Sequence, residues 1–104
     1  MSQPPPELFQ TWIHSHEDDT ATERVYRPAG YAFPPSRGRT GFELRPDRTC
    51  TRIGISPRNG STRAAGTWEY EENDERVLTL SLGTGQGETI RIVSVAPDRL
   101  VTRK

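Results

Sequence analysis

Two histidines separated by one residue, His14 and His16, are the first side chains whose types and spacing suggest chemistry. On a β-strand, residues i and i+2 share a face, so these two imidazoles could chelate a metal ion. Such a site needs a third ligand, which Glu23 on the next segment could supply. The spacing does not fit a cupin metal site, and the alternative is a pair of solvated histidines beside an acidic turn. We therefore expect no bound metal and no cofactor.

A second group of candidate residues comes from two neighbouring predicted strands, residues 8–17 and 22–27. Trp12 shares a face with His14, and Arg24 shares a face with Tyr26. If these faces point inward, His14, Arg24 and Tyr26 form a polar cluster that could orient an anionic or phenolic ligand. The alternative is that they are solvated, because Val25 on the opposite face competes for the core. The sequence leaves both readings open.

The Pro-rich and Gly-rich segment 28–38 contains two aromatic residues, Tyr31 and Phe33, which we expect to pack over one end of the fold. Close behind them, Arg37 and Arg39 could hold a carboxylate or phosphate, although loop arginines are more often solvated. We assign no catalytic residue. The predicted ligand-binding residues are Trp12, His14, Arg24, Tyr26, Tyr31, Phe33 and Arg39.

The elements that must position these residues are short strands separated by turns. Alternation of apolar and polar residues, with period 2, is clearest from residue 41 onward. We predict strands over residues 8–17, 22–27, 41–45, 49–55, 66–70, 77–82, 90–95 and 100–101. Turn residues such as Pro46-Asp47 and Asn59-Gly60 separate them.

Hairpin-length connections favour an all-β fold, a small antiparallel up-and-down meander barrel of about eight strands. We expect one barrel domain over residues 8–104 after a disordered Pro-rich tail, residues 1–7. Trp68 and Tyr70 share a face and should form the centre of the core with the leucines of segment 77–82. Cys50 should lie opposite the row of Thr51, Ile53 and Ile55, with no neighbouring base to activate it.

The composition restricts the function classes. The chain has 104 residues, 14 basic and 14 acidic residues, and a formal net charge of 0. Because the charges are mixed along the chain, we expect neither a nucleic-acid groove nor a polybasic membrane anchor. The single cysteine and the absence of an apolar leader favour a cytoplasmic protein. The expected partner is a small apolar or anionic ligand.

Three features give the chain a resemblance to the bacterial lipocalin-like (calycin-type) small barrels. Trp12 lies on an early strand, a Gly-Phe-Glu-Leu-x-Pro-Asp hairpin spans residues 41–47, and Gly-Thr-Trp-Glu spans residues 66–69. The family's first-strand Gly-x-Trp reads Gln10-Thr11-Trp12 here. The resemblance implies a closed barrel that binds a small apolar ligand.

Two other classes of function remain open at this point. One is a small-barrel enzyme of the isomerase or cyclase type, with His14 or Tyr26 performing acid–base chemistry. The other is a protein-interaction module that uses the aromatic segment 28–38. An interior cavity would favour ligand binding or catalysis over the interaction module, and a perturbed titratable residue in that cavity would favour catalysis.

Overall fold

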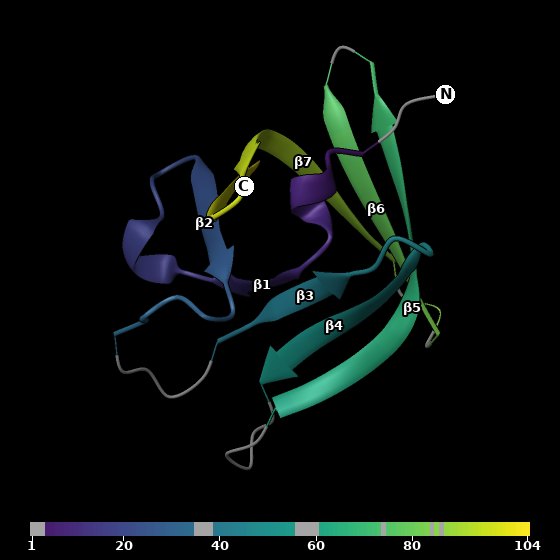
Figure 1. The fold of residues 1–104 in the computed structure, drawn as a ribbon, viewed down its shortest axis with the longest axis horizontal. Helices are drawn as coiled ribbons and strands as arrows, with labels where there is room; N and C mark the ends of the chain where they lie inside the picture. The colour runs from purple at the N-terminus through teal and green to yellow at the C-terminus, as the bar shows by residue number, and fades with distance from the viewer. Residues whose placement is uncertain (1–3, 35–38, 56–60, 74, 84, 86) are drawn as a thin grey trace.

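The computed structural model describes residues 4–34, 39–55, 61–73, 75–83, 85 and 87–104. The predicted Asn59-Gly60 turn and Arg37 lie outside these residues. Eight strands form a closed antiparallel barrel (Figure 1). They are β1 (Thr11–His14), β2 (Glu23–Pro28), β3 (Gly41–Leu44), β4 (Thr49–Ile55), β5 (Ser61–Glu72), β6 (Arg76–Leu82), β7 (Gly87–Ala96) and β8 (Arg99–Arg103). Two 3₁₀-helices, η1 (Pro6–Leu8) and η2 (His16–Asp18), flank β1.

The predicted all-β, antiparallel barrel of about eight strands is confirmed, and β3 to β8 follow one another around it as a meander. The order departs from the simplest meander at one place, because β1 lies between β2 and β3. Both of these strands run antiparallel to β1 and therefore parallel to each other.

The two ends of the barrel differ, and η1 covers one of them. In Figure 1 the purple segment that contains η1 lies within the ring of strands. Leu8 is fully buried there, and the indole N–H of Trp12 donates to its carbonyl at 3.3 Å. The next residue, Phe9, packs its ring 6.0 Å from that of Trp68. Large apolar side chains therefore plug the η1 end.

The first predicted strand, residues 8–17, is shorter in the structure. Only Thr11–His14 is extended, and a 3₁₀-helix lies on either side. The chain leaves the strand at Ser15, whose N–H donates to the Val25 carbonyl, while the Asp18 N–H donates back to Ser15. The predicted tail, residues 1–7, lies partly outside the described residues, and η1 begins within it.

The expected orientation of segment 49–55 was reversed. Cys50 is fully buried on the core face, where it is the cross-strand partner of Leu44. The opposite face carries Thr51 and Ile53, which are also buried, and the Arg45 guanidinium covers Thr51 through a 2.7 Å hydrogen bond. Because both faces of β4 are covered, alternation alone did not identify the interior face.

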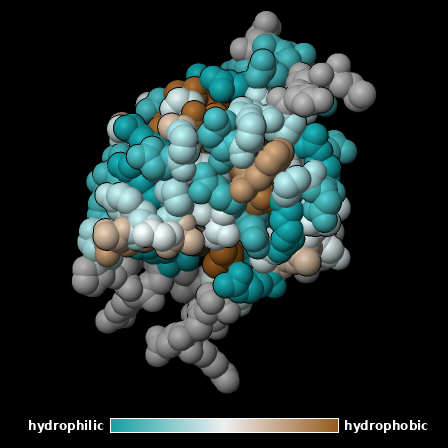
Figure 2. Space-filling view, in the orientation of Figure 1, coloured by the Kyte–Doolittle hydropathy of each residue, from teal (hydrophilic) through white to brown (hydrophobic). Residues whose placement is uncertain are grey.

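The outer surface is mostly polar. The face seen in Figure 2 is largely hydrophilic, and apolar side chains appear there only in small separate patches. Neither short helix in the described part of the chain has the length or apolar character of a membrane-spanning helix.

The core phenol of Tyr70 should make stability pH-dependent in the alkaline range. Burial raises its pKa to about 12, and the hydrogen bond from its hydroxyl to Glu72, at 2.7 Å, acts in the same direction. An unfolded tyrosine loses its proton near pH 10. Between these two values the unfolded state holds fewer protons, so the free energy of unfolding falls as pH rises.

We expect the melting temperature, followed by circular dichroism, to decrease between pH 10 and 12. Tyr70→Phe should make that decrease shallower, although Tyr26, whose pKa burial also raises, will retain part of it. An identical alkaline slope in the variant and the wild type would contradict this assignment.

Candidate functional site

The barrel end opposite η1 carries polar side chains on its inner face. Arg52 is the cross-strand partner of Phe42, and Glu88 is the partner of Leu80. Phe42 and Leu80 are fully buried in the core, and cross-strand partners share a face, so both charged residues face inward. His14 and Tyr26 are likewise partners of each other. We call this group the polar end: His14, Arg24, Tyr26, Arg52 and Glu88.

Tyr26 lies at the centre of the polar end. It is 4% exposed, and its ring centroid lies 5.3 Å from that of His14 and 5.1 Å from that of Phe42. Burial raises the pKa of its hydroxyl, although the charges of Arg52 and Arg24 act in the opposite direction. The phenol therefore stays protonated at neutral pH and offers a hydrogen-bond donor.

Arg52 and Glu88 form a half-buried ion pair beside Tyr26. The Arg52 Nε lies 2.9 Å from one Glu88 carboxylate oxygen, and Nη2 lies 3.4 Å from the other. Its Nη1 also donates to the Gly41 carbonyl at 2.6 Å. These bonds hold the guanidinium in one orientation, and Glu88 balances its charge.

Arg24 differs from Arg52 because its charge is not balanced. It lies on the same face of β2 as Tyr26, near enough for its positive charge to act against burial, which raises the pKa of the Tyr26 hydroxyl, and it is itself exposed. Within the ranges that the structure describes, it forms no ion pair with a carboxylate. One positive charge at the rim of the polar end is therefore available to an anion.

His14 is held at the edge of this group by an acidic partner. Its Nε2 lies 2.9 Å from an Asp19 carboxylate oxygen, and the other Asp19 oxygen accepts the Val25 N–H at 2.8 Å. This second bond ties the β1–β2 connection to the backbone of β2, where Val25 and Tyr26 are both buried, on opposite faces of the strand. Burial of Val25 therefore did not exclude an inward Tyr26.

The two histidines do not share a strand face, because His16 belongs to η2. Its side chain is mostly exposed, beside Glu17. The described residues contain no group of three or more side chains placed to hold a metal ion.

The structure brings only part of the predicted ligand-binding set together. Trp12 is fully buried and packs as a core residue, whereas His14, Arg24 and Tyr26 meet at the polar end. Tyr31 and Phe33 instead stack against each other, with ring centroids 5.0 Å apart.

This aromatic pair lies on the outside of the barrel. The Arg27 guanidinium is 4.9 Å from the Tyr31 ring, and Arg27 follows the inward Tyr26, so it belongs to the outer face of β2. Arg39 lies over Phe33 and forms a two-bond ion pair with Glu17, which lowers the pKa of that carboxyl to about 2. The Arg39 guanidinium therefore already pairs with the Glu17 carboxylate of the same chain.

Two recesses in the described surface lie elsewhere. One, of about 690 Å³, follows β5 between Arg48 and Asn73, and the other, of about 400 Å³, surrounds Glu75. In the second, Glu75 accepts hydrogen bonds from Arg91 and Arg103. No predicted ligand-binding residue lines either recess.

Sequence reasoning missed Arg52 and Glu88. Counting residue pairs outward from the Pro46-Asp47 turn places Arg52 opposite Phe42. The inward position of Arg52 could therefore have been found from the sequence. Glu88 follows a Gly-rich turn that leaves the register undetermined, and no sequence signal identified it.

This geometry defines the class of protein: a closed eight-stranded antiparallel β-barrel, plugged by aromatic residues at one end and lined by charged residues at the other. No protein-family model, curated protein or solved structure matches the chain.

Proposed function

We propose that the protein is a lipocalin-like small-molecule-binding barrel that takes a small carboxylate with an apolar body at its polar end. The observation that carries this proposal is Arg24, an exposed guanidinium without a carboxylate partner in the described structure, adjoining the hydroxyl of buried Tyr26. A guanidinium and a phenol together offer the donors that a carboxylate needs.

Each group has a distinct role in this proposal. Arg24 forms the ion pair with the ligand, and Tyr26, protonated at neutral pH, donates a hydrogen bond. The inward positions beside Arg52 hold small residues, Gly54 on β4 and Ala64 on β5. The apolar body of the ligand would lie against them.

Acid–base catalysis stays a second hypothesis. Burial raises the pKa of Tyr26, so at neutral pH its hydroxyl could donate a proton but is a poor general base. Use of the outer aromatic pair, Tyr31 and Phe33, as an interaction surface stays a hypothesis.

A cytoplasmic location is part of the proposal, because the single cysteine, Cys50, is a free buried thiol.

The test is calorimetric titration with three eight-carbon probes: octanoate, octanol and octylamine. We expect octanoate to bind best, because only its carboxylate can pair with Arg24. Arg24→Gln should weaken octanoate binding about tenfold, as expected for loss of a charge-assisted hydrogen-bonded pair. Arg27→Gln is the matched control, because Arg27 lies on the same strand but faces outward.

Equal binding of octanoate and octylamine, or equal losses in the two arginine variants, would show that the polar end does not recognise a carboxylate. The melting temperature of Arg24→Gln should stay close to that of the wild type, because Arg24 is exposed and forms no ion pair in the described structure. Arg27→Gln should lower it slightly, because it removes the ion pair of Arg27 with Asp18.

A further inference from the structure

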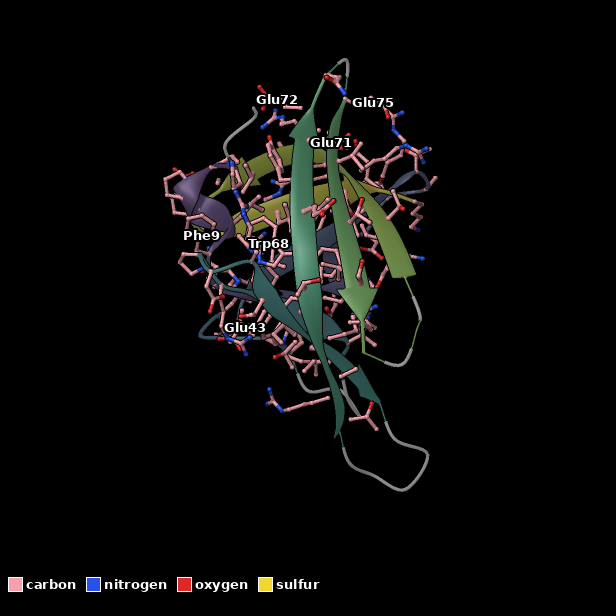
Figure 3. The ribbon with its side chains drawn as sticks, turned by 90° about the vertical axis from the view of Figure 1, so that its right-hand side faces the viewer. Phe9, Glu43, Trp68, Glu71, Glu72 and Glu75 are labelled. Carbon is pink, nitrogen blue, oxygen red and sulfur yellow. The ribbon has the colours of Figure 1, made fainter. Side chains whose placement is uncertain are left out.

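One stretch of the barrel wall has an open edge. β5 is the longest strand, with 12 residues, and it pairs with β6 as far as Glu72. Its pairing with β4 ends at Thr67, opposite Thr49. Residues 68–72, here called the β5 overhang, therefore have no strand beside them on the β4 side among the described residues. Figure 3 shows this part of β5, with Trp68, Glu71 and Glu72 labelled and β6 along one side.

Backbone groups of the overhang point toward the open edge. The Trp68 N–H donates to the Arg48 carbonyl at 2.9 Å, so Trp68 directs its peptide groups to the β4 side. Strand residues alternate in this direction, and Tyr70 must therefore direct its N–H and C=O to the same side. Within the described part of the chain, neither group has a hydrogen-bond partner there.

A groove follows this edge, and its charge is suited to a cation. It has a volume of about 690 Å³ and is lined by Trp68, Glu69, Tyr70 and Glu71, with Arg48 at one end. Both glutamates are exposed. The Arg48 guanidinium already lies 4.6 Å from the Trp68 ring centroid, as a cation on an aromatic face.

Arg48 also adopts an unusual backbone conformation, with φ of 72°. This left-handed geometry is uncommon for residues other than glycine, and here it brings the guanidinium over the indole. The groove thus holds one cation supplied by the chain itself, beside two carboxylates that face solvent.

We propose that the β5 overhang binds an extended peptide segment of another protein, with alternating basic and apolar residues, as an added β-strand. The Tyr70 peptide group would pair with the backbone of this segment. Its basic side chains would lie opposite Glu69 and Glu71, and the apolar side chains between them would point to the other face of the added strand. A second copy of the chain is a poorer occupant, because it would place like-charged glutamates opposite each other.

The experiment uses the capped peptide Ac-Arg-Val-Arg-Val-Arg-NH₂ and nitrogen-15-labelled full-length protein. Hydrogen exchange of the Tyr70 amide should slow at least tenfold when the peptide is bound. The Glu69 amide points to β6 and is already paired, so its exchange should change little. The acidic peptide Ac-Glu-Val-Glu-Val-Glu-NH₂ should not bind.

Charge variants test the recognition independently of the backbone. Glu71→Lys should weaken the arginine peptide about fivefold, because it places like charges opposite each other. Asp98→Lys, in the exposed β7–β8 turn, changes the net charge equally and should leave binding unchanged. Arg24→Gln should also have no effect, which separates this proposal from that for the polar end.

Three results would overturn the proposal: no binding of the arginine peptide, binding without protection of the Tyr70 amide, or equal losses in Glu71→Lys and Asp98→Lys. Concentration-dependent dimerisation that protects the same amide without peptide would assign the edge to a second copy instead. Sedimentation velocity of the free protein measures that dimerisation.

Discussion

Replacing Trp68 by alanine should lower the free energy of unfolding by about 3–5 kcal/mol, the range for a large aromatic residue removed from a core. Trp68 is 1% exposed, and its indole N–H donates to the Arg45 carbonyl at 3.0 Å. Its ring also contacts Phe9 of the segment that plugs the barrel. The truncation therefore opens a cavity and removes one of the two hydrogen bonds that the Arg45 carbonyl accepts, the other coming from the Arg48 N–H at 3.1 Å.

A domain of this size holds about 5–10 kcal/mol in total, so Trp68→Ala should be close to unfolding at 37 °C. Urea unfolding followed by circular dichroism measures the loss. Val93→Ala is the control, because Val93 is 38% exposed, and it should cost less than about 0.5 kcal/mol. A loss below about 1 kcal/mol for Trp68→Ala would mean that this side chain is not part of the core.

A single methyl group at Gly66 should also be severely destabilising. A Cβ built there would overlap the backbone carbonyl of Ser81 and lie 2.9 Å from the Leu82 Cα, both on the neighbouring strand β6. Backbone atoms cannot move aside as a flexible side chain can, so β5 and β6 would have to separate. We expect Gly66→Ala to cost about 3 kcal/mol or more, at the upper end for overpacking.

Gly83→Ala provides the matched control for this substitution. Its nearest atom, the Ala65 carbonyl oxygen, would lie 3.5 Å from the new Cβ, an ordinary contact. Thermal and urea unfolding of the two variants should differ by about 2 kcal/mol or more, given the usual range for overpacking. Equal stabilities would show that the two strands do not approach closely at Gly66.

Several elements were predictable from local pattern. The hairpin of β3 and β4 follows from alternation on either side of Pro46-Asp47, and the core contribution of Trp68 and Tyr70 follows from their spacing. Period-2 alternation and turn chemistry act over a few residues, so they are visible in the sequence before any tertiary contact is known. The contact of His14 with Tyr26 is one of the two arrangements that the sequence left open.

Other features depend on contacts between distant segments. The Arg52–Glu88 ion pair joins residues 36 positions apart, and the position of β1 between β2 and β3 is set by closure of the barrel. The β5 overhang exists because β5 continues past Thr67, the residue that pairs with Thr49 at the start of β4. The length of the overhang depends on the register between the two strands. Strand alternation also could not tell which face of β4 is interior, the face of Cys50 or the face of Thr51, because residues on both faces are buried.

The sequence by itself therefore determined the fold class and most of the strands, because these follow from local alternation and turn residues. Only the tertiary structure decided which faces point inward, which charged side chains meet at the polar end, and where an edge stays open. Strand register and barrel closure set these features, and both depend on pairing between residues far apart in the chain.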